Sequence, residues 1–309
     1  MKLKFQFLAV GPIFIQRVDG KLKVSENKQW MFFGGIVLFL PSSFDMQNLA
    51  RKWAIMTAGG PLVSLGNFLF FYVLHQATGI PNYLNFYILH LVIFLATALP
   101  LKSHTYMTDS SSFLLLLKNN EKTKQHLYSI ITSKERFSLR RPKDWNSEII
   151  NMCLERINTE RDMTEKVTDT TLLFYFYSVR EGLKKGVFFL KPLLEVPVTH
   201  KHKFLLSFFH SSYMLYKFLH ESERSTLADM KKHFKAVPKT SLYYYYRSLV
   251  MIKYLENDLE TTMKYLKKAE EELRYYEKSG LGFWKLERTL FQSLQEKIAS
   301  PNKMTELSI

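Results

Sequence analysis

Two long uncharged stretches limit what this chain can fold into more than any other feature. Residues 53–74 (WAIMTAGGPLVSLGNFLFFYVL) and 83–101 (YLNFYILHLVIFLATALPL) contain no Asp, Glu, Lys or Arg. A helix of about 20 apolar residues is long enough to cross the ~30 Å hydrocarbon core of a bilayer. The sequence therefore predicts two transmembrane helices. The alternative interpretation is a buried helical hairpin of a soluble protein.

The charges next to these stretches predict how the chain lies in the membrane. The connecting residues 75–82 carry no Lys or Arg, whereas Arg51, Lys52 and Lys102 flank the outer ends of the pair. Basic residues concentrate on the cytoplasmic side of membrane proteins. We therefore expect an integral cell-membrane protein whose connecting turn is outside and whose C-terminal region is cytoplasmic.

Short β-prone runs precede the first stretch. Residues 13–18 (IFIQRV) and 21–24 (KLKV) flank an Asp-Gly pair, Asp19-Gly20. Asp-Gly favours the tight turn of a β-hairpin, because both residues tolerate a positive φ. The sequence predicts an N-terminal β-hairpin within residues 1–29.

A third apolar run, residues 30–41, is too short to cross a bilayer as a helix. Gly34-Gly35 within it permits a sharp bend or a close approach of another backbone. We interpret it as a strand or re-entrant segment, which opens a membrane unit over residues 30–118.

The remainder, residues 119–309, is predicted to be an all-α region of amphipathic helices separated by X-Pro and Ser-Gly breaks. Its paired helices resemble a helical-repeat array, although the tetratricopeptide signature is not legible. Tyrosines 243–246 are interpreted as a packed helix face rather than a base-stacking platform. The predicted helices cover residues 119–132, 147–157, 164–183, 202–219, 225–234, 242–255, 259–276 and 283–298.

The chain is basic, with 43 Lys and Arg against 28 Asp and Glu and a net charge of +15. This charge suits a cytoplasmic region near an anionic leaflet. Nucleic-acid binding is the alternative, but the charge forms no stripe and no nucleic-acid-binding signature is present, so no nucleic-acid partner is expected. A single cysteine, Cys153, rules out an intramolecular disulfide and a Cys-based zinc site.

Two features of the membrane unit are unusual for a plain anchor. The first stretch contains Ala-Gly-Gly-Pro at residues 58–61, where small residues allow close helix contact and the proline frees a carbonyl. The second ends in Leu-Pro at residues 99–100, and Asp109 follows. An ionisable residue at membrane depth suggests a functional site. The alternative is that Asp109 caps a helix at the interface.

Together these features resemble the site-2 protease-like family of intramembrane zinc metallopeptidases, over residues 5–117. The resemblance rests on the hairpin, Phe33-Gly34-Gly35, the Ala-Gly-Gly-Pro span and the Leu-Pro followed by Asp109. In that family a His-Glu-x-x-His helix supplies two zinc ligands and a general base, and a later Asp supplies the third ligand. The resemblance implies that Asp109 is a metal ligand. It also implies a substrate-binding strand edge at Gly34 and Gly35, which would take up an unfolded peptide by β-augmentation.

The chain departs from this pattern in several places. It contains no His-Glu-x-x-His; the nearest string, residues 220–224 (HESER), has Arg in place of the second His. Ser64, Thr97 and Ser110 stand where the family usually has Asn, Asn and Gly. Zinc is therefore not expected to bind this chain alone. We expect either an N-terminally truncated or a degenerate member of the family.

The leading hypothesis is a membrane-embedded metallopeptidase homologue that acts on membrane-inserted or exported peptides once a catalytic helix is supplied. Its partners would be the lipid bilayer and a membrane-inserted peptide or partner protein. The alternative is a non-catalytic membrane adaptor or peptide self-protection protein, whose helical region binds a partner. A third hypothesis is a membrane-tethered helical-repeat regulator. If this chain does bind zinc alone, His104 is the first candidate for an unrecognised ligand.

Overall fold

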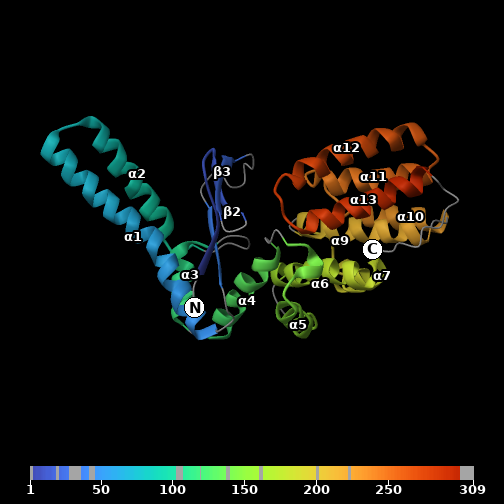
Figure 1. Ribbon diagram of the computed structural model, residues 1–309, viewed down its shortest axis with the longest axis horizontal. Helices are drawn as coiled ribbons and strands as arrows, with labels where there is room; N and C mark the ends of the chain where they lie inside the picture. Colours follow the sequence, from blue (N-terminus) through green and yellow to red (C-terminus); the bar gives the residue numbers. More distant parts are fainter. Residues whose placement is uncertain are drawn as a thin grey trace. The chain divides into compact units, whose positions relative to one another are not determined.

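The computed structural model describes residues 3–18, 21–27, 36–41, 46–101, 107–118, 120–136, 140–159, 163–199, 202–221 and 224–299. In these residues the chain is mainly helical, with a small sheet near its N-terminus (Figure 1). It divides into two compact units, Met1–Ile131 and Thr132–Ile309. The predicted boundary between the membrane unit and the helical region lay after residue 118.

The first unit begins with an antiparallel sheet of four strands in the order β3-β2-β1-β4. In β2–β3, Val18 pairs with Lys21, so only residues 19 and 20 lie between the paired strands. This confirms the predicted hairpin, and a second hairpin joins β1 to β2 through Gly11, at φ +51°. The strands are β1 Leu3–Val10, β2 Ile13–Val18, β3 Lys21–Glu26 and β4 Ile36–Pro41.

Strand β4 extends this sheet beyond the predicted hairpin. It runs antiparallel to β1, from the pair Ala9–Ile36 to the pair Leu3–Pro41. In the hairpin, β2 provides hydrogen-bond partners for the backbone groups along one edge of β1. Strand β4 provides them along the other edge. Residues 36–41 are therefore a strand of the N-terminal sheet. The predicted substrate-binding residues Gly34 and Gly35 lie outside the described residues.

The two uncharged stretches form helices α1 (Met46–Thr78) and α2 (Pro81–Ala98), which pack against each other (Figure 1). Both are long and apolar enough to cross a membrane, and α2 has no buried residue. Gly79, at φ +67°, makes the turn between them. The second stretch was predicted to run to residue 101, but α2 ends at Ala98, because the residue before Pro100 is disfavoured in helical conformation.

Two side-chain hydrogen bonds join helix α4 to helix α3 within the first unit. Helix α3 spans Asp109–Leu117 and α4 spans Glu121–Arg136. The Thr123 hydroxyl donates to the Leu115 carbonyl at 2.6 Å, and Ser112 Oγ lies 2.9 Å from His126 Nε2. The first half of α4 is thus bound to α3, which explains why the division between the units falls within α4.

The second unit consists of helices, most of which agree with the predicted ranges to within a few residues. The short helices α7 and α8 were not predicted; they lie between the predicted helices at residues 164–183 and 202–219. Asn146 caps α5 and Asp258 caps α12 through their side-chain oxygens. The helices after α4 are α5 Ser147–Arg156, α6 Met163–Glu181, α7 Leu183–Phe188, α8 Lys191–Leu194, α9 Lys203–His220, α10 Arg224–Phe234, α11 Leu242–Leu255, α12 Leu259–Glu277 and α13 Phe283–Ala299.

The core of this unit lies among α6, α9, α11, α12 and α13. Consecutive helices from α9 to α13 pack against each other, and α9 also contacts α6, α7, α8, α11 and α13. Fully buried apolar side chains come from each of the long helices, among them Phe174, Phe209, Met251, Leu273 and Phe291. The predicted packed tyrosine face is confirmed, since Tyr243 is buried and Tyr246 stacks on Tyr265.

Candidate functional site

Asp109 lies against helix α1 at the Ala-Gly-Gly-Pro run. A β-carbon added at Gly60 would be only 2.9 Å from the carboxylate oxygen Oδ2 of Asp109. Gly60 therefore provides the space that the carboxylate occupies. Burial raises the pKa of Asp109 above its ordinary value. The two parts of the sequence that carry the resemblance are brought together here, although they are about fifty residues apart.

The backbone leading into α3 is fixed by Thr108. Its hydroxyl donates to the Leu99 carbonyl at 2.8 Å, and its backbone N–H donates to the Leu101 carbonyl at 3.0 Å. Thr108 is also the residue that precedes the helix, while Asp109 is the first residue within it. The alternative prediction of Asp109 as a helix cap is therefore wrong by one position. A carboxylate in the first turn still interacts favourably with the helix dipole.

The residues that replace the family pattern have local roles. The Thr97 hydroxyl donates to the Ile93 carbonyl of its own helix at 2.9 Å, and Ser64 is buried on α1. Ser110 Oγ lies 3.3 Å from Thr108 Oγ1. These hydroxyls are poor zinc ligands compared with His, Cys or carboxylate side chains.

The residues around Asp109 do not by themselves fit a zinc ion. A catalytic zinc site uses three protein ligands, from His, Cys, Asp or Glu. In the described part of the chain, no group of three or more such side chains could hold a metal. Asp109 supplies one carboxylate, and His104 lies outside the described residues. A three-ligand site at Asp109 would therefore need at least one ligand from outside the described residues.

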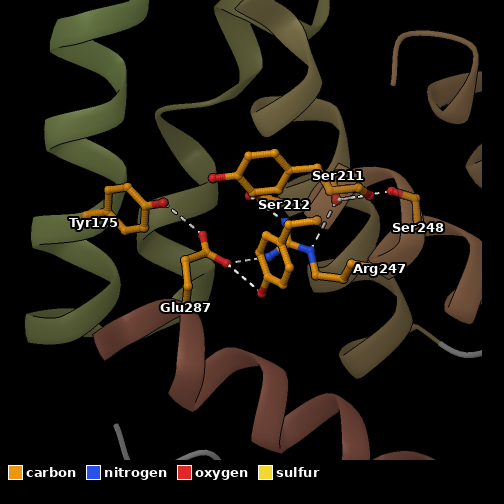
Figure 2. Close-up of polar contacts among 8 residues, drawn as sticks. Tyr175, Ser211, Ser212, Arg247, Ser248 and Glu287 are labelled. Atoms are coloured by element: carbon orange, nitrogen blue, oxygen red, sulfur yellow. Dashed lines mark hydrogen bonds and ion pairs between the residues drawn. The ribbon is translucent and has the colours of Figure 1, made fainter. Parts of the chain in front are cut away.

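The second unit contains a buried polar cluster that the sequence did not predict (Figure 2). Arg247 Nη1 donates to Glu287 Oε2 at 2.6 Å, and both side chains are fully buried. Tyr175 and Tyr243 donate to the two oxygens of the same carboxylate, at 2.8 and 3.1 Å. The cluster thus joins helices α6, α11 and α13 through one glutamate.

The guanidinium of Arg247 is satisfied on its other side by serines of α9. Its Nε donates to Ser211 Oγ at 3.1 Å and its Nη2 to Ser212 Oγ at 3.2 Å. Ser248 Oγ in turn donates to Ser211 Oγ at 3.0 Å (Figure 2). Both oxygens of Glu287 and all three nitrogens of the Arg247 guanidinium therefore have a hydrogen-bond partner, and a buried ion pair is tolerated only under that condition.

Burial and the ion pair fix the protonation states of the cluster. Burial, with the adjacent Glu287 carboxylate, raises the pKa values of Tyr175 and Tyr243 well above their ordinary values. Although burial lowers the pKa of Arg247, the Glu287 charge raises it further, so the guanidinium stays charged. The tyrosines are hydrogen-bond donors, and the cluster holds four helices together rather than presenting a reactive group.

A sequence signal for this cluster exists. Glu287, Phe291 and Leu294 follow the i, i+4, i+7 spacing of a buried helix stripe, and Arg247 shares its stripe with Tyr243 and Met251. A charged residue within an apolar stripe indicates a buried charge that needs a partner. The spacing does not reveal which partner it has.

A histidine pair forms a second polar contact in this unit. His210 of α9 and His233 of α10 have their Nδ1 atoms 2.8 Å apart. Asp229 Oδ1 lies 3.6 Å from His233 Nε2, and Lys217 Nζ lies 3.1 Å from Asp229 Oδ2. Burial, together with the charge of His233, lowers the pKa of His210 to about 4. The pKa of His233 is lowered as well, chiefly by burial.

We expect the second unit to lose stability as the pH falls from about 6.5 toward 4. In this range the unfolded chain, in which the His210 pKa is about 6.5, binds a proton that the folded chain excludes. The loss attributable to His210 is about 3 kcal/mol. Thermal unfolding followed through Trp145 and Trp284, both buried in this unit, measures it against pH. His210→Gln should flatten the dependence and the half-buried control His202→Gln should not; equal slopes in all three proteins would contradict this assignment.

Comparison of the chain with models of known protein families, with characterised proteins and with solved structures gave no significant match.

Proposed function

We propose that this chain is a membrane-spanning protein of the site-2 protease-like type, in which α1, α2 and α3 place Asp109 as one ligand of a zinc site. The two remaining ligands come from outside the described residues, on another segment or another chain. In the assembled site the protein would act on membrane-inserted or exported peptides. The helical second unit is cytoplasmic in this proposal.

The contact between Asp109 and Gly60 carries the proposal. If Asp109 only capped a helix at the membrane interface, no glycine would be needed opposite its carboxylate. Here a β-carbon added at Gly60 would lie only 2.9 Å from Oδ2 of Asp109. The carboxylate lies beside the candidate span α1, and half-burial already disfavours its charged form. A cationic partner such as a metal ion would offset that cost.

The surface of the two candidate spans supports a membrane location. Helix α2 buries none of its residues, and large apolar side chains of both helices are exposed in the structure, among them Leu62, Val63, Phe70 and Val92. A soluble protein seldom leaves so large a continuous apolar surface uncovered. Lipid chains would cover it, and this favours membrane helices over the alternative of a buried soluble hairpin.

A metal analysis of the protein from its own membranes tests the proposal. We expect the protein to stay in the carbonate-washed membrane fraction, and to carry one zinc ion per chain when extracted with its associated proteins. Asp109→Asn should remove the zinc without removing the protein from the membrane. The chain produced alone should carry no stoichiometric zinc.

Glu121→Gln is the matched control, because Glu121 is an exposed carboxylate of the same unit. It should leave the zinc content unchanged. Zinc retained in the Asp109 variant would remove Asp109 from the ligand set. A zinc-free wild-type complex would contradict the metallopeptidase proposal and favour the non-catalytic adaptor. Loss of the protein in the carbonate wash would contradict its membrane-spanning part.

A further inference from the structure

The second unit contains a cleft of about 460 Å³ whose walls are basic. One wall is the short 3₁₀ turn η2 (Pro142–Asp144) with the residue before it, which provide Arg141 and Lys143. The opposite wall is the start of α13, which provides Lys285 and Arg288. These two segments are more than a hundred residues apart in the sequence. The sequence therefore gave no sign of the cleft.

Three of the four cations have no acidic partner among the described residues. Arg288 is held by Glu277, with its Nε 2.9 Å from Oε1 and its Nη2 at Oε2. Glu277 is the acidic residue of the cleft lining. Arg141, Lys143 and Lys285 are exposed, and no ion pair or hydrogen bond involves their side chains in the described part of the chain. The cleft thus carries uncompensated positive charge on both walls.

The basic walls are held in place by contacts outside the cleft. Arg180 Nη2 donates to the Lys143 carbonyl at 3.1 Å, and Arg140 Nη2 donates to both oxygens of the buried Glu135 at 2.7 and 2.8 Å. At Gly282 an added β-carbon would lie only 1.6 Å from the Arg140 carbonyl oxygen. The turn is therefore packed tightly against the residue preceding α13. A preformed site binds its ligand at a smaller cost in conformational entropy.

We propose that this cleft binds a compact phosphate-bearing ligand carrying two or more negative charges. Its volume lies in the range of small-molecule sites. Arg and Lys are the side chains that bind phosphate oxygens. A ligand with a single carboxylate would neutralise only one of the three unpaired cations, whereas a phosphate-bearing ligand can carry two or more negative charges. Among the described residues, no aromatic side chain lines the cleft, so those residues offer a nucleotide base no stacking surface. The phosphate could belong to a free metabolite or to a lipid headgroup.

Calorimetric titration of the full chain in neutral detergent with pyrophosphate tests the site. We expect saturable binding at low ionic strength that weakens as salt is added. Lys143→Ala and Lys285→Ala should each weaken binding about fivefold to tenfold, and the double variant more, because each removes a cation from one wall. Both side chains are exposed, so the unfolding temperature should not change.

Lys267→Ala is the charge-matched control, since Lys267 is exposed on α12 and does not line the cleft. It should bind pyrophosphate like the wild type. An equal loss in this control, an unchanged affinity in the double variant, or no saturable binding would overturn the proposal. Tighter binding of an acidic peptide than of pyrophosphate would also overturn it, in favour of a protein partner.

A second titration distinguishes the two sources of the phosphate group. The chain is reconstituted in nanodiscs of phosphatidylcholine with or without phosphatidic acid. If the ligand is a lipid headgroup, phosphatidic acid should weaken pyrophosphate binding by competition in the wild type. If the ligand is a free metabolite, both nanodiscs should give the same affinity. The test does not depend on zinc at Asp109, so the two proposals can fail separately.

Discussion

Glu287→Gln is expected to destabilise the second unit by about 3–5 kcal/mol, because it leaves Arg247 charged and buried without its counter-ion. The carboxylate accepts from Arg247, Tyr175 and Tyr243 at 2.6–3.1 Å. An amide of the same shape offers one oxygen and directs its NH₂ group at these donors. For a unit of this size the unfolding temperature should fall by roughly 10 °C.

The fluorescence of Trp145 and Trp284 measures this change, since both side chains are buried in the second unit. Glu296→Gln is the matched control, because Glu296 lies exposed on the same helix, α13. It should shift the unfolding temperature by no more than about 1 °C, in line with other surface substitutions. A loss below about 1 kcal/mol in Glu287→Gln would show that water reaches the ion pair.

A double substitution separates the lost ion pair from lost packing. Arg247→Met combined with Glu287→Leu removes both charges, so no unpaired charge remains. We expect it to be more stable than Glu287→Gln alone. It should not regain wild-type stability, because the buried hydroxyls of Tyr175 and Tyr243 lose the carboxylate that accepts their hydrogen bonds.

Gly282→Ala is also expected to destabilise this unit. The added methyl group would overlap the Arg140 carbonyl oxygen at 1.6 Å, and the next nearest atoms are also backbone. A backbone clash cannot be relieved by a side-chain rotation, so the turn before η2 must move away from α13. The cost of such overpacking is about 1–3 kcal/mol or more.

The fluorescence of Trp145 and Trp284 also measures the loss of stability in Gly282→Ala. Gly66→Ala is the control, because a methyl group there meets no atom within 4 Å, and it should leave the second unit unaffected. The same substitution at Gly282 should also weaken pyrophosphate binding, since Arg141 and Lys143 move with the turn. Wild-type stability with wild-type binding in Gly282→Ala would show that the turn and α13 are not in the contact described.

Much of the local structure follows from sequence patterns that act over short distances. The Asp-Gly pair between two β-prone runs predicts the register of β2 and β3, because turn geometry fixes which residues pair. Helices such as α11 and α12 follow from apolar periodicity and from the breaks between them, and α11 was predicted at the residues where it lies, 242–255. The pairing of β4 with β1 was not predicted, since a free strand edge does not say which later segment will cover it.

The candidate sites divide in the same way. The sequence by itself determined the two helices that are long and apolar enough for a membrane, because length and lack of charge are properties of one segment. It also marked Asp109 and Gly60 separately. Only the tertiary structure placed the Asp109 carboxylate next to Gly60, paired Arg247 with Glu287, and brought Arg141 and Lys285 to opposite walls of one cleft. These arrangements bring together residues 40 or more positions apart. They depend on how whole helices pack rather than on the preferences of any single segment.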